Sequence, residues 1–217
     1  MNLFKKTDNE EIKSVVPPNF GWLEKKLSSV EMDYLWRCVN NRGKSYKDNL
    51  VGQIHESNEL TDKSDWFFIN TLKPLMFEYR IRFGNLGKRS PIVGKHPYFL
   101  EKMWVNFQKK NEFNPIHNHS GVYSFVIWMK IPTKHSEQNK NPISSRANTQ
   151  KISTFQFAYV NTLGEICFYN YEMNPENEGT ILFFPSKLHH SVYPFYNCDE
   201  DRISISGNIS INTAKVV

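Results

Sequence analysis

The chain has 217 residues, of which 39% are hydrophobic and 14% aromatic, and its net charge is +5 at neutral pH. This length suits one domain with a single core, and the hydrophobic content excludes a disordered chain. No apolar run reaches the roughly 18 residues that a membrane span needs, and no secretory leader is expected in residues 1–13.

Cysteine usage and charge favour a soluble protein of a reducing cytosol. The three cysteines are scattered and lack CxxC spacing, so a disulfide framework is not expected. Lysines and arginines are spread along the chain, and no nucleic-acid-binding motif occurs, which indicates a solvated surface rather than a nucleic-acid partner. The sequence leaves the oligomeric state open, and a homodimer is compatible with it.

Residues 1–97 are expected to form a mainly helical region that packs on the rest of the domain. Ser28 and Glu31 have the spacing of a capping box at the start of "SSVEMDYLWRCVN", whose apolar residues follow a helical stripe. A second helix is predicted over about 65–83, and Pro74 must kink or split it. The segment 83–97 contains three glycines and two prolines, which break regular structure.

Residues 98–217 have the pattern of a β-structure. Short apolar or alternating runs separated by polar turns predict strands at "FLEKMWVNFQ", "YSFVIWMKI", "STFQFAYV", "EICFYNY", "GTILFFP", "HHSVYPF" and "RISISGNISI". Strands at such spacing predict a sandwich or barrel rather than βαβ units. The polar segment 133–151 lies between two of these strands, and we expect either a mobile lid beside the active site or a passive insertion.

Two histidines mark the start of the second predicted strand. His117 and His119 stand at i and i+2 in "NPIHNHSG", so an extended backbone would point both rings to one side. Imidazole is a common ligand of zinc and of first-row metals such as iron. A third candidate, His190, follows the "FPS" turn, while its neighbour His189 should face away as a surface or supporting residue. The sequence therefore predicts a metal site formed by His117, His119 and His190.

The last predicted strand alternates cleanly between polar and apolar residues. Arg202 and Ser204 share its polar face, which either faces water or lines a pocket. In a pocket, Arg202 would offer a planar fork that matches a carboxylate, and Ser204 would add a hydroxyl.

The order of these motifs resembles that of the iron(II)/2-oxoglutarate-dependent oxygenases. An HxH strand, a distal histidine after an "FPS" turn and an RxS ending are similar to the prolyl-hydroxylase-like branch found in bacteria and phages, over about residues 98–211. The resemblance implies a double-stranded β-helix (jelly roll) that binds Fe(II) and uses 2-oxoglutarate and O2 to hydroxylate a substrate that the sequence does not identify. In this family, His119 stands where a carboxylate ligand is usual. The resemblance also implies that Arg202, Ser204 and Asn106 bind 2-oxoglutarate.

Two other functions remain compatible with the same residues. A cupin-like metalloprotein with three histidine ligands would not use 2-oxoglutarate and would not need Arg202 in its pocket. A barrel with a binding or structural role, for example in a phage particle, would hold no metal.

Overall fold

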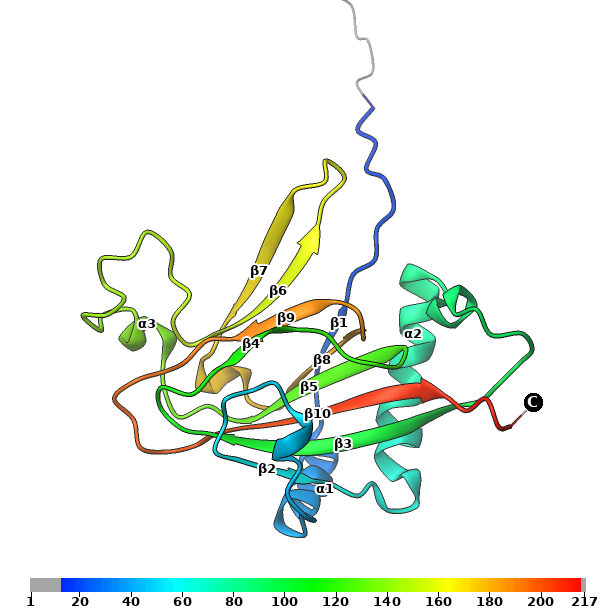
Figure 1. Ribbon diagram of the computed structural model, residues 1–217, viewed down its shortest axis with the longest axis horizontal. Helices are drawn as coiled ribbons and strands as arrows, with labels where there is room; N and C mark the ends of the chain where they lie inside the picture. Colours follow the sequence, from blue (N-terminus) through cyan, green and yellow to red (C-terminus); the bar gives the residue numbers. More distant parts are fainter. Residues whose placement is uncertain (1–12, 216–217) are drawn as a thin grey trace, which may run out of the picture.

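The computed structural model describes residues 13–215 and contains two antiparallel sheets that face each other (Figure 1). The larger sheet has the strand order β1-β8-β5-β10-β3-β2, and the smaller sheet has the order β4-β9-β6-β7. The strands run over Leu23–Lys26 (β1), Glu56–Glu59 (β2), Tyr98–Gln108 (β3), Asn114–His117 (β4), Tyr123–Lys130 (β5), Thr154–Val160 (β6), Ile166–Glu172 (β7), Thr180–Pro185 (β8), His189–Val192 (β9) and Arg202–Ile211 (β10).

Strands β3 to β10 alternate between the sheets in the manner of a double-stranded β-helix. Consecutive strands cross from one sheet to the other, except that β6 and β7 form a hairpin within the smaller sheet. Every strand predicted after residue 97 is present, so the predicted fold class is confirmed. β4, whose register is irregular, was expected only as an extended segment around His117.

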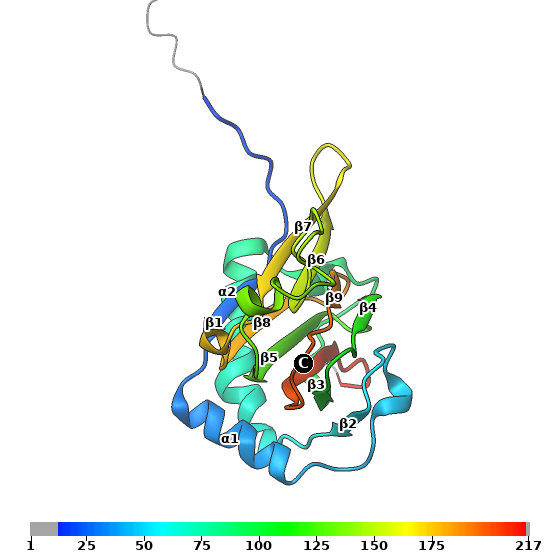
Figure 2. The same cartoon turned by 90° about the vertical axis from the view of Figure 1, so that its left-hand side faces the viewer.

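The helices α1 (Ser29–Asn40) and α2 (Lys73–Phe83) cover the outer face of the larger sheet, on the side opposite the smaller sheet (Figure 2). The short α3 (His135–Gln138) lies apart from them, and the single turns are η1 (Lys47–Asn49), η2 (Lys63–Asp65), η3 (Phe68–Leu72), η4 (Leu86–Arg89) and η5 (Pro175–Asn177). The predicted capping box of Ser28 and Glu31 starts α1. None of the helices in residues 13–215 is long and apolar enough to cross a membrane.

Pro74 lies at the start of α2, directly after the π-helical segment η3. A proline cannot donate the backbone hydrogen bond of a regular turn, and a wider turn lets the preceding residues keep their bonds. Lys73 accordingly donates to the carbonyl of Phe68, five residues earlier. The predicted helix therefore continues across Pro74, with its regular turns interrupted by the π-helical segment η3.

The region 1–97 also contributes two strands that its sequence did not predict. β1 pairs with β8 and β2 pairs with β3, so they extend the larger sheet at both edges.

Two apolar clusters lie between the layers of the structure and hold them together. One lies between helices and larger sheet around Leu35, Phe67 and Tyr79, and the other lies between the two sheets around Trp128, Phe155 and Phe184.

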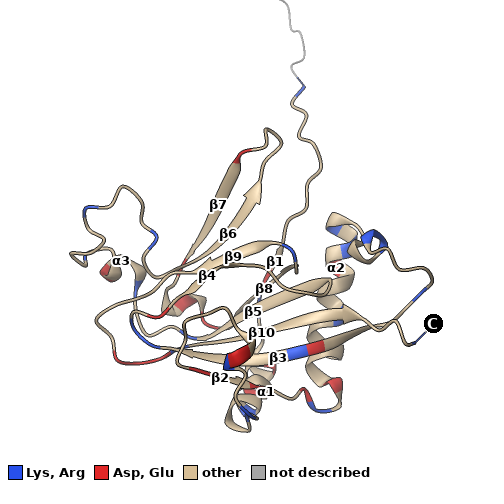
Figure 3. Ribbon diagram, viewed as in Figure 1, with Lys and Arg blue, Asp and Glu red and all other residues tan. Residues whose placement is uncertain are grey.

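Charged residues lie mainly on helices, loops and edge strands (Figure 3). The central strand β5 carries a single charged residue, Lys130 at its end, because it is buried on both faces. The interior between the two sheets therefore receives few charged side chains from the central strands.

Candidate metal centre

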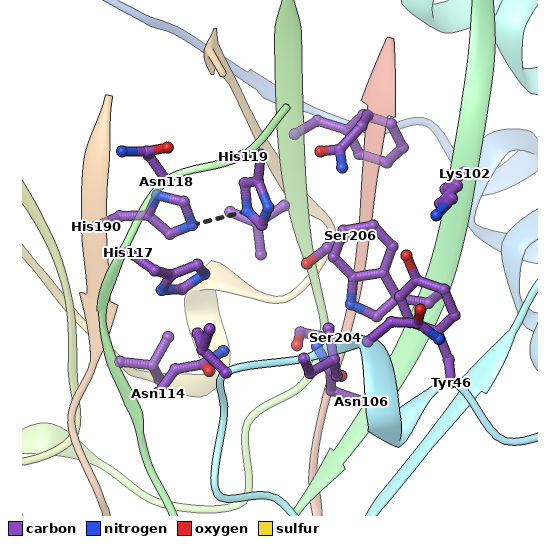
Figure 4. Close-up of a pocket in the computed structure, with 18 of the residues that line it drawn as sticks. Tyr46, Lys102, Asn106, Asn114, His117, Asn118, His119, His190, Ser204 and Ser206 are labelled. Atoms are coloured by element: carbon purple, nitrogen blue, oxygen red, sulfur yellow. Dashed lines mark hydrogen bonds between the residues drawn. The ribbon is translucent and has the colours of Figure 1, made fainter. Parts of the chain in front are cut away.

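Three histidine rings converge between the two sheets (Figure 4). One ligand atom from each of His117, His119 and His190 lies within 4.8 Å of the other two. Bonds of about 2 Å to one metal ion need nitrogen atoms about 4 Å apart or less, so small ring rotations suffice to close the site. Elsewhere in residues 13–215, no other group of three or more His, Cys, Asp or Glu side chains has such spacing.

Backbone pairing positions two of the rings. His117 on β4 and His190 on β9 are direct partners in an antiparallel ladder. The Nδ1 atoms of His117 and His190 lie 2.7 and 3.0 Å from the carbonyl oxygens of Pro115 and Leu188. A carbonyl can only accept, so each Nδ1 carries the proton and each Nε2 keeps its lone pair for a metal.

The "FPS" turn positions the third ring. The backbone N–H of His119 donates to the carbonyl of Ser186 at 2.8 Å, and the Ser186 hydroxyl donates to the carbonyl of Gly121. Gly121 has a φ of +84°, and a Cβ there would lie 2.8 Å from the carbonyl oxygen of Ile209. Only glycine allows the chain to leave the HxH segment this closely against β10.

All three imidazoles are uncharged at neutral pH. Burial lowers the pKa of His117, lowers that of His119 to about 4, and lowers that of His190 well below its usual value, with mutual repulsion among the rings adding to the effect. A metal ion therefore does not have to displace protons from its ligands. The neighbouring His189 is exposed on the other face of β9, as expected, and accepts a hydrogen bond from the Asn118 amide.

The histidines form one wall of a cavity of about 270 Å³. β3 and β10 form the opposite wall, where Asn106 and Ser204 are direct partners in the ladder and both line the cavity. Arg202, one step further along β10, does not line it. The Arg202 guanidinium is buried and donates to the Gln108 side chain at 2.9 and 3.1 Å, to the Tyr193 carbonyl at 2.8 Å and to the Ser153 hydroxyl at 3.4 Å.

Several lining residues were not expected from the sequence. Tyr46 and the segment 49–51 close the cavity from the N-terminal region, and β3 adds Lys102 and Trp104. The latter two share the strand parity of Asn106, so alternation along β3 could have identified them. Nothing in the sequence of 46–51 indicates this location.

The lid expected at 133–151 is not supported, because none of these residues lines the histidine cavity and only Lys151 lines the adjoining hollow that shares Asn114 and Val192 with it. The segment follows Lys130, at the end of β5 remote from the HxH turn. Its first part is anchored, since the Gln138 side chain donates to the carbonyl of Tyr196 and accepts from its N–H.

Solved structures with a similar arrangement include oxygenases at low sequence identity. A prolyl-4-hydroxylase from Pseudomonas putida is 12% identical, with 89% of this chain and 94% of that chain covered and a TM-score of 0.49. The viral collagen prolyl hydroxylase of Paramecium Bursaria Chlorella virus-1, solved with 2-oxoglutarate, is 15% identical, with 87% and 94% covered and a TM-score of 0.46. HygX from Streptomyces hygroscopicus, with nickel, 2-oxoglutarate and hygromycin B bound, is 11% identical, with 88% and 83% covered and a TM-score of 0.47.

The sequence itself matches a protein family over its central strands. No curated protein matches the chain. Residues 102–208 match the family model described as "Putative 2OG-Fe(II) oxygenase", and this segment includes the three histidines together with Asn106, Arg202 and Ser204. The segment 102–208, which carries the candidate metal centre, is therefore similar to the 2OG-Fe(II) oxygenases.

Proposed function

We propose that the protein is an iron(II)- and 2-oxoglutarate-dependent dioxygenase that hydroxylates an organic substrate. The observation that carries this proposal is the convergence of three neutral imidazoles in a cavity within the segment that matches the oxygenase family. Neutral imidazole nitrogens suit first-row metals such as iron(II).

His117, His119 and His190 would hold the iron. Bound together, iron(II) and 2-oxoglutarate would activate O2, which is the oxidant, while 2-oxoglutarate is converted to succinate and carbon dioxide. The chain's own part is to orient the ligands and to exclude water. Phe155 and Phe184 pack against the His190 ring with centroids 5.6 and 5.1 Å away, and Trp104 packs against His119 at 5.8 Å.

The residues opposite the histidines fit a dicarboxylate. Asn106 is 4% exposed, its Oδ1 has no hydrogen-bond partner in the described part of the chain, and Ser204 stands beside it. Arg202 lies two residues from Ser204 on β10. Its buried guanidinium is positively charged, and all its hydrogen-bond partners in the described residues are neutral. A buried guanidinium without an anion is costly, and a carboxylate would relieve that cost. The distal carboxylate of 2-oxoglutarate would lie toward Arg202, with Ser204 and Asn106 along its length.

The histidine at position 119 strengthens the preference for anionic ligands. A carboxylate ligand would cancel one of the two charges of iron(II), whereas three neutral imidazoles cancel none. The dianionic 2-oxoglutarate balances that charge by itself. This arrangement also leaves the cavity without any carboxylate from the protein among its lining residues.

One observation favours a second candidate, a three-histidine metalloprotein of the cupin type. Arg202 does not line the cavity, as such a protein would have no need for it there. Anaerobic titration of the purified protein with iron(II) and then with 2-oxoglutarate distinguishes the candidates. We expect a visible metal-to-ligand charge-transfer band on adding 2-oxoglutarate. Iron binding without that band would favour the cupin type, and absence of iron binding would favour a barrel without a metal.

A further inference from the structure

The cavity extends beyond the metal centre on the side away from Arg202. β3 presents Asn106, Trp104 and Lys102 to it at every second residue, steps of about 7 Å. Trp104 lies next to the ring of His119 and so marks the level of the metal centre. Asn106 lies on the side of Arg202, which the proposed function assigns to 2-oxoglutarate. Lys102 lies on the opposite side, where Figure 4 shows it close to Tyr46.

The Lys102 ammonium places a positive charge at this end of the cavity, and no carboxylate in the described chain pairs with it. It is the only lining residue with a full charge at neutral pH, and within residues 13–215 no carboxylate lies within ion-pair distance of it. Its neighbouring acid on β3, Glu101, contacts Ser210 instead. The Lys102 Nζ lies 5.9 Å from the centroid of the Tyr46 ring.

A row of rings connects Lys102 to the metal centre. Tyr46 stacks on Trp104 with centroids 5.1 Å apart and an interplanar angle of 25°, and Trp104 contacts His119 edge to face. A ligand held by Lys102 along this row would therefore reach the histidines without leaving the cavity.

The Trp104 indole adds an independent sign of a ligand. Trp104 lines the cavity and is 3% exposed, and its Nε1 has no hydrogen-bond partner within residues 13–215. An indole N–H can only donate, and leaving a buried donor unpaired costs about 1–3 kcal/mol. A ligand that brings an acceptor oxygen would satisfy this N–H. Asn208, opposite Lys102 in the ladder, adds a polar amide at the same end.

The size of the cavity limits what can fill it. Its volume of about 270 Å³ is at the lower end for small-molecule sites, which measure roughly 300–1,000 Å³. Only a small molecule, or the end of a longer one, can therefore lie inside beside 2-oxoglutarate.

We propose that the end of the cavity formed by Lys102, Trp104 and Tyr46 binds a carboxylate group of the primary substrate, which is an organic acid. This inference rests on the proposed function, because it takes the other end of the cavity to be filled by 2-oxoglutarate. The Lys102 ammonium would pair with the carboxylate, and the Trp104 N–H would donate to one of its oxygens. The remainder of the acid would then lie against His119.

The test uses zinc-loaded protein with saturating 2-oxoglutarate, since zinc supports binding without oxidation. The probes are butyrate and its neutral counterpart butyramide, and the signal is the indole N–H resonance of Trp104 in a ¹H–¹⁵N NMR spectrum. The variant Trp104→Phe assigns that resonance among the five tryptophans. We expect butyrate to shift it in a saturable way and butyramide to leave it in place at equal concentration. Equal shifts by both probes, or no shift by butyrate, would overturn the proposal.

Three variants test the role of the charge. Lys102→Met should weaken butyrate binding by about fivefold or more, the upper range for an exposed ion pair. Lys102→Arg should keep binding close to that of the parent. Lys109→Met removes the same charge from an exposed position just after β3, outside the cavity, and should leave binding unchanged. Parental affinity for butyrate in Lys102→Met would overturn the proposal.

Affinity for 2-oxoglutarate, measured on the same zinc-loaded proteins without added 2-oxoglutarate at the start, separates the two proposals. We expect Lys102→Met to bind 2-oxoglutarate like the parent. If Lys102→Met weakens 2-oxoglutarate as strongly as butyrate, Lys102 binds the cosubstrate, and the assignment to the primary substrate is overturned. If the parent binds no 2-oxoglutarate, the proposed function fails, and butyrate titration of the zinc protein alone still decides whether Lys102 forms an acid site.

Discussion

His117 and His190 are direct partners in the ladder between β4 and β9, and their ring centroids lie 4.3 Å apart. The register of two strands therefore fixes the distance between the first and the last of the three candidate ligands. His119 lies just after β4 and outside this ladder. Its backbone N–H donates a hydrogen bond to the Ser186 carbonyl instead. The site is thus organised by backbone hydrogen bonds before any metal binds, which reduces the conformational cost of binding.

Replacing His190 with Ala should remove metal binding almost completely. The loss in zinc affinity should exceed about 100-fold, the upper range for removing a residue that merely supports a ligand. The matched control is His189→Ala, which changes the adjacent, exposed histidine on the other face of β9 and should bind zinc like the parent. Isothermal titration calorimetry measures both. Equal affinities for the two variants would contradict the assignment of His190.

The metal-free protein should lose stability in acid as the buried histidines take up protons. The pKa of His119 is about 4 when folded and 6.5 ordinarily, because burial opposes its charge. Below pH 6.5 the unfolded state binds more protons, so the contribution of His119 is complete above pH 6.5 and is lost as the pH falls toward 4. The loss should be on the order of 3 kcal/mol.

Urea denaturation of the metal-free protein at about pH 7 and about pH 4.5 measures this loss. In His119→Asn the free energy of unfolding should fall less between the two pH values than in the parent. His189→Asn, at an exposed position, should retain the parental fall. An identical pH dependence in His119→Asn and the parent would show that His119 is not the group responsible.

The strands and the three histidines could be predicted because their signals are local. Alternation with period two marks β10, and an i, i+2 spacing places His117 and His119 on one side of an extended chain. The capping box at Ser28 is equally local and is confirmed. The short edge strands β1 and β2 are different, because their sequences LEKK and ESNE carry no strand pattern and are strands only through pairing with β8 and β3.

The residues that line the cavity beyond the histidines could not be predicted from any single segment of the sequence. Tyr46 is brought to Trp104 by the path of the N-terminal region across the barrel, which leaves no local signature. The location of 133–151 could not be predicted for a related reason. Composition indicated an irregular segment, but only the direction of β5 determines at which end of the barrel that segment lies.

Replacing Glu31 with Gln should destabilise the fold at neutral pH by about 1–3 kcal/mol. The Glu31 carboxylate accepts hydrogen bonds from Lys25 of β1, Ser28 at the start of α1 and Thr71 of η3, so it joins three elements. Burial alone would raise its pKa, but these hydrogen bonds lower it from 4.5 to about 2. The stabilisation is complete above pH 4.5 and is lost as the pH falls toward 2.

Thermal unfolding of Glu31→Gln and the parent should therefore differ at neutral pH and converge in acid. The matched control is Glu78→Gln, because Glu78 forms an exposed pair with Arg82 one helical turn away. Such a pair contributes about 0.3–0.5 kcal/mol, so this variant should hardly change the melting temperature. A difference for Glu31→Gln that stays constant down to acid pH would contradict a role for its charge.

The Arg202 guanidinium decides between an oxygenase and a metal site without 2-oxoglutarate. Burial lowers its pKa to about 9, so it remains charged at neutral pH, and all its partners in the described chain are neutral. Replacing Arg202 with Ala should weaken 2-oxoglutarate binding by about 2–5 kcal/mol, the range for removing one member of a buried charge pair. Zinc affinity should persist, because the three histidines are unchanged. Arg202→Lys, which keeps the charge but not the planar fork, should bind 2-oxoglutarate with intermediate affinity.

Because Gln108 also loses its donor when Arg202 is replaced, circular dichroism must first confirm that each variant is folded. A folded Arg202→Ala protein with parental affinity for 2-oxoglutarate would mean that this arginine only ties β10 to Gln108 and Tyr193. The three-histidine site would then need another anion-binding group, or would work without 2-oxoglutarate.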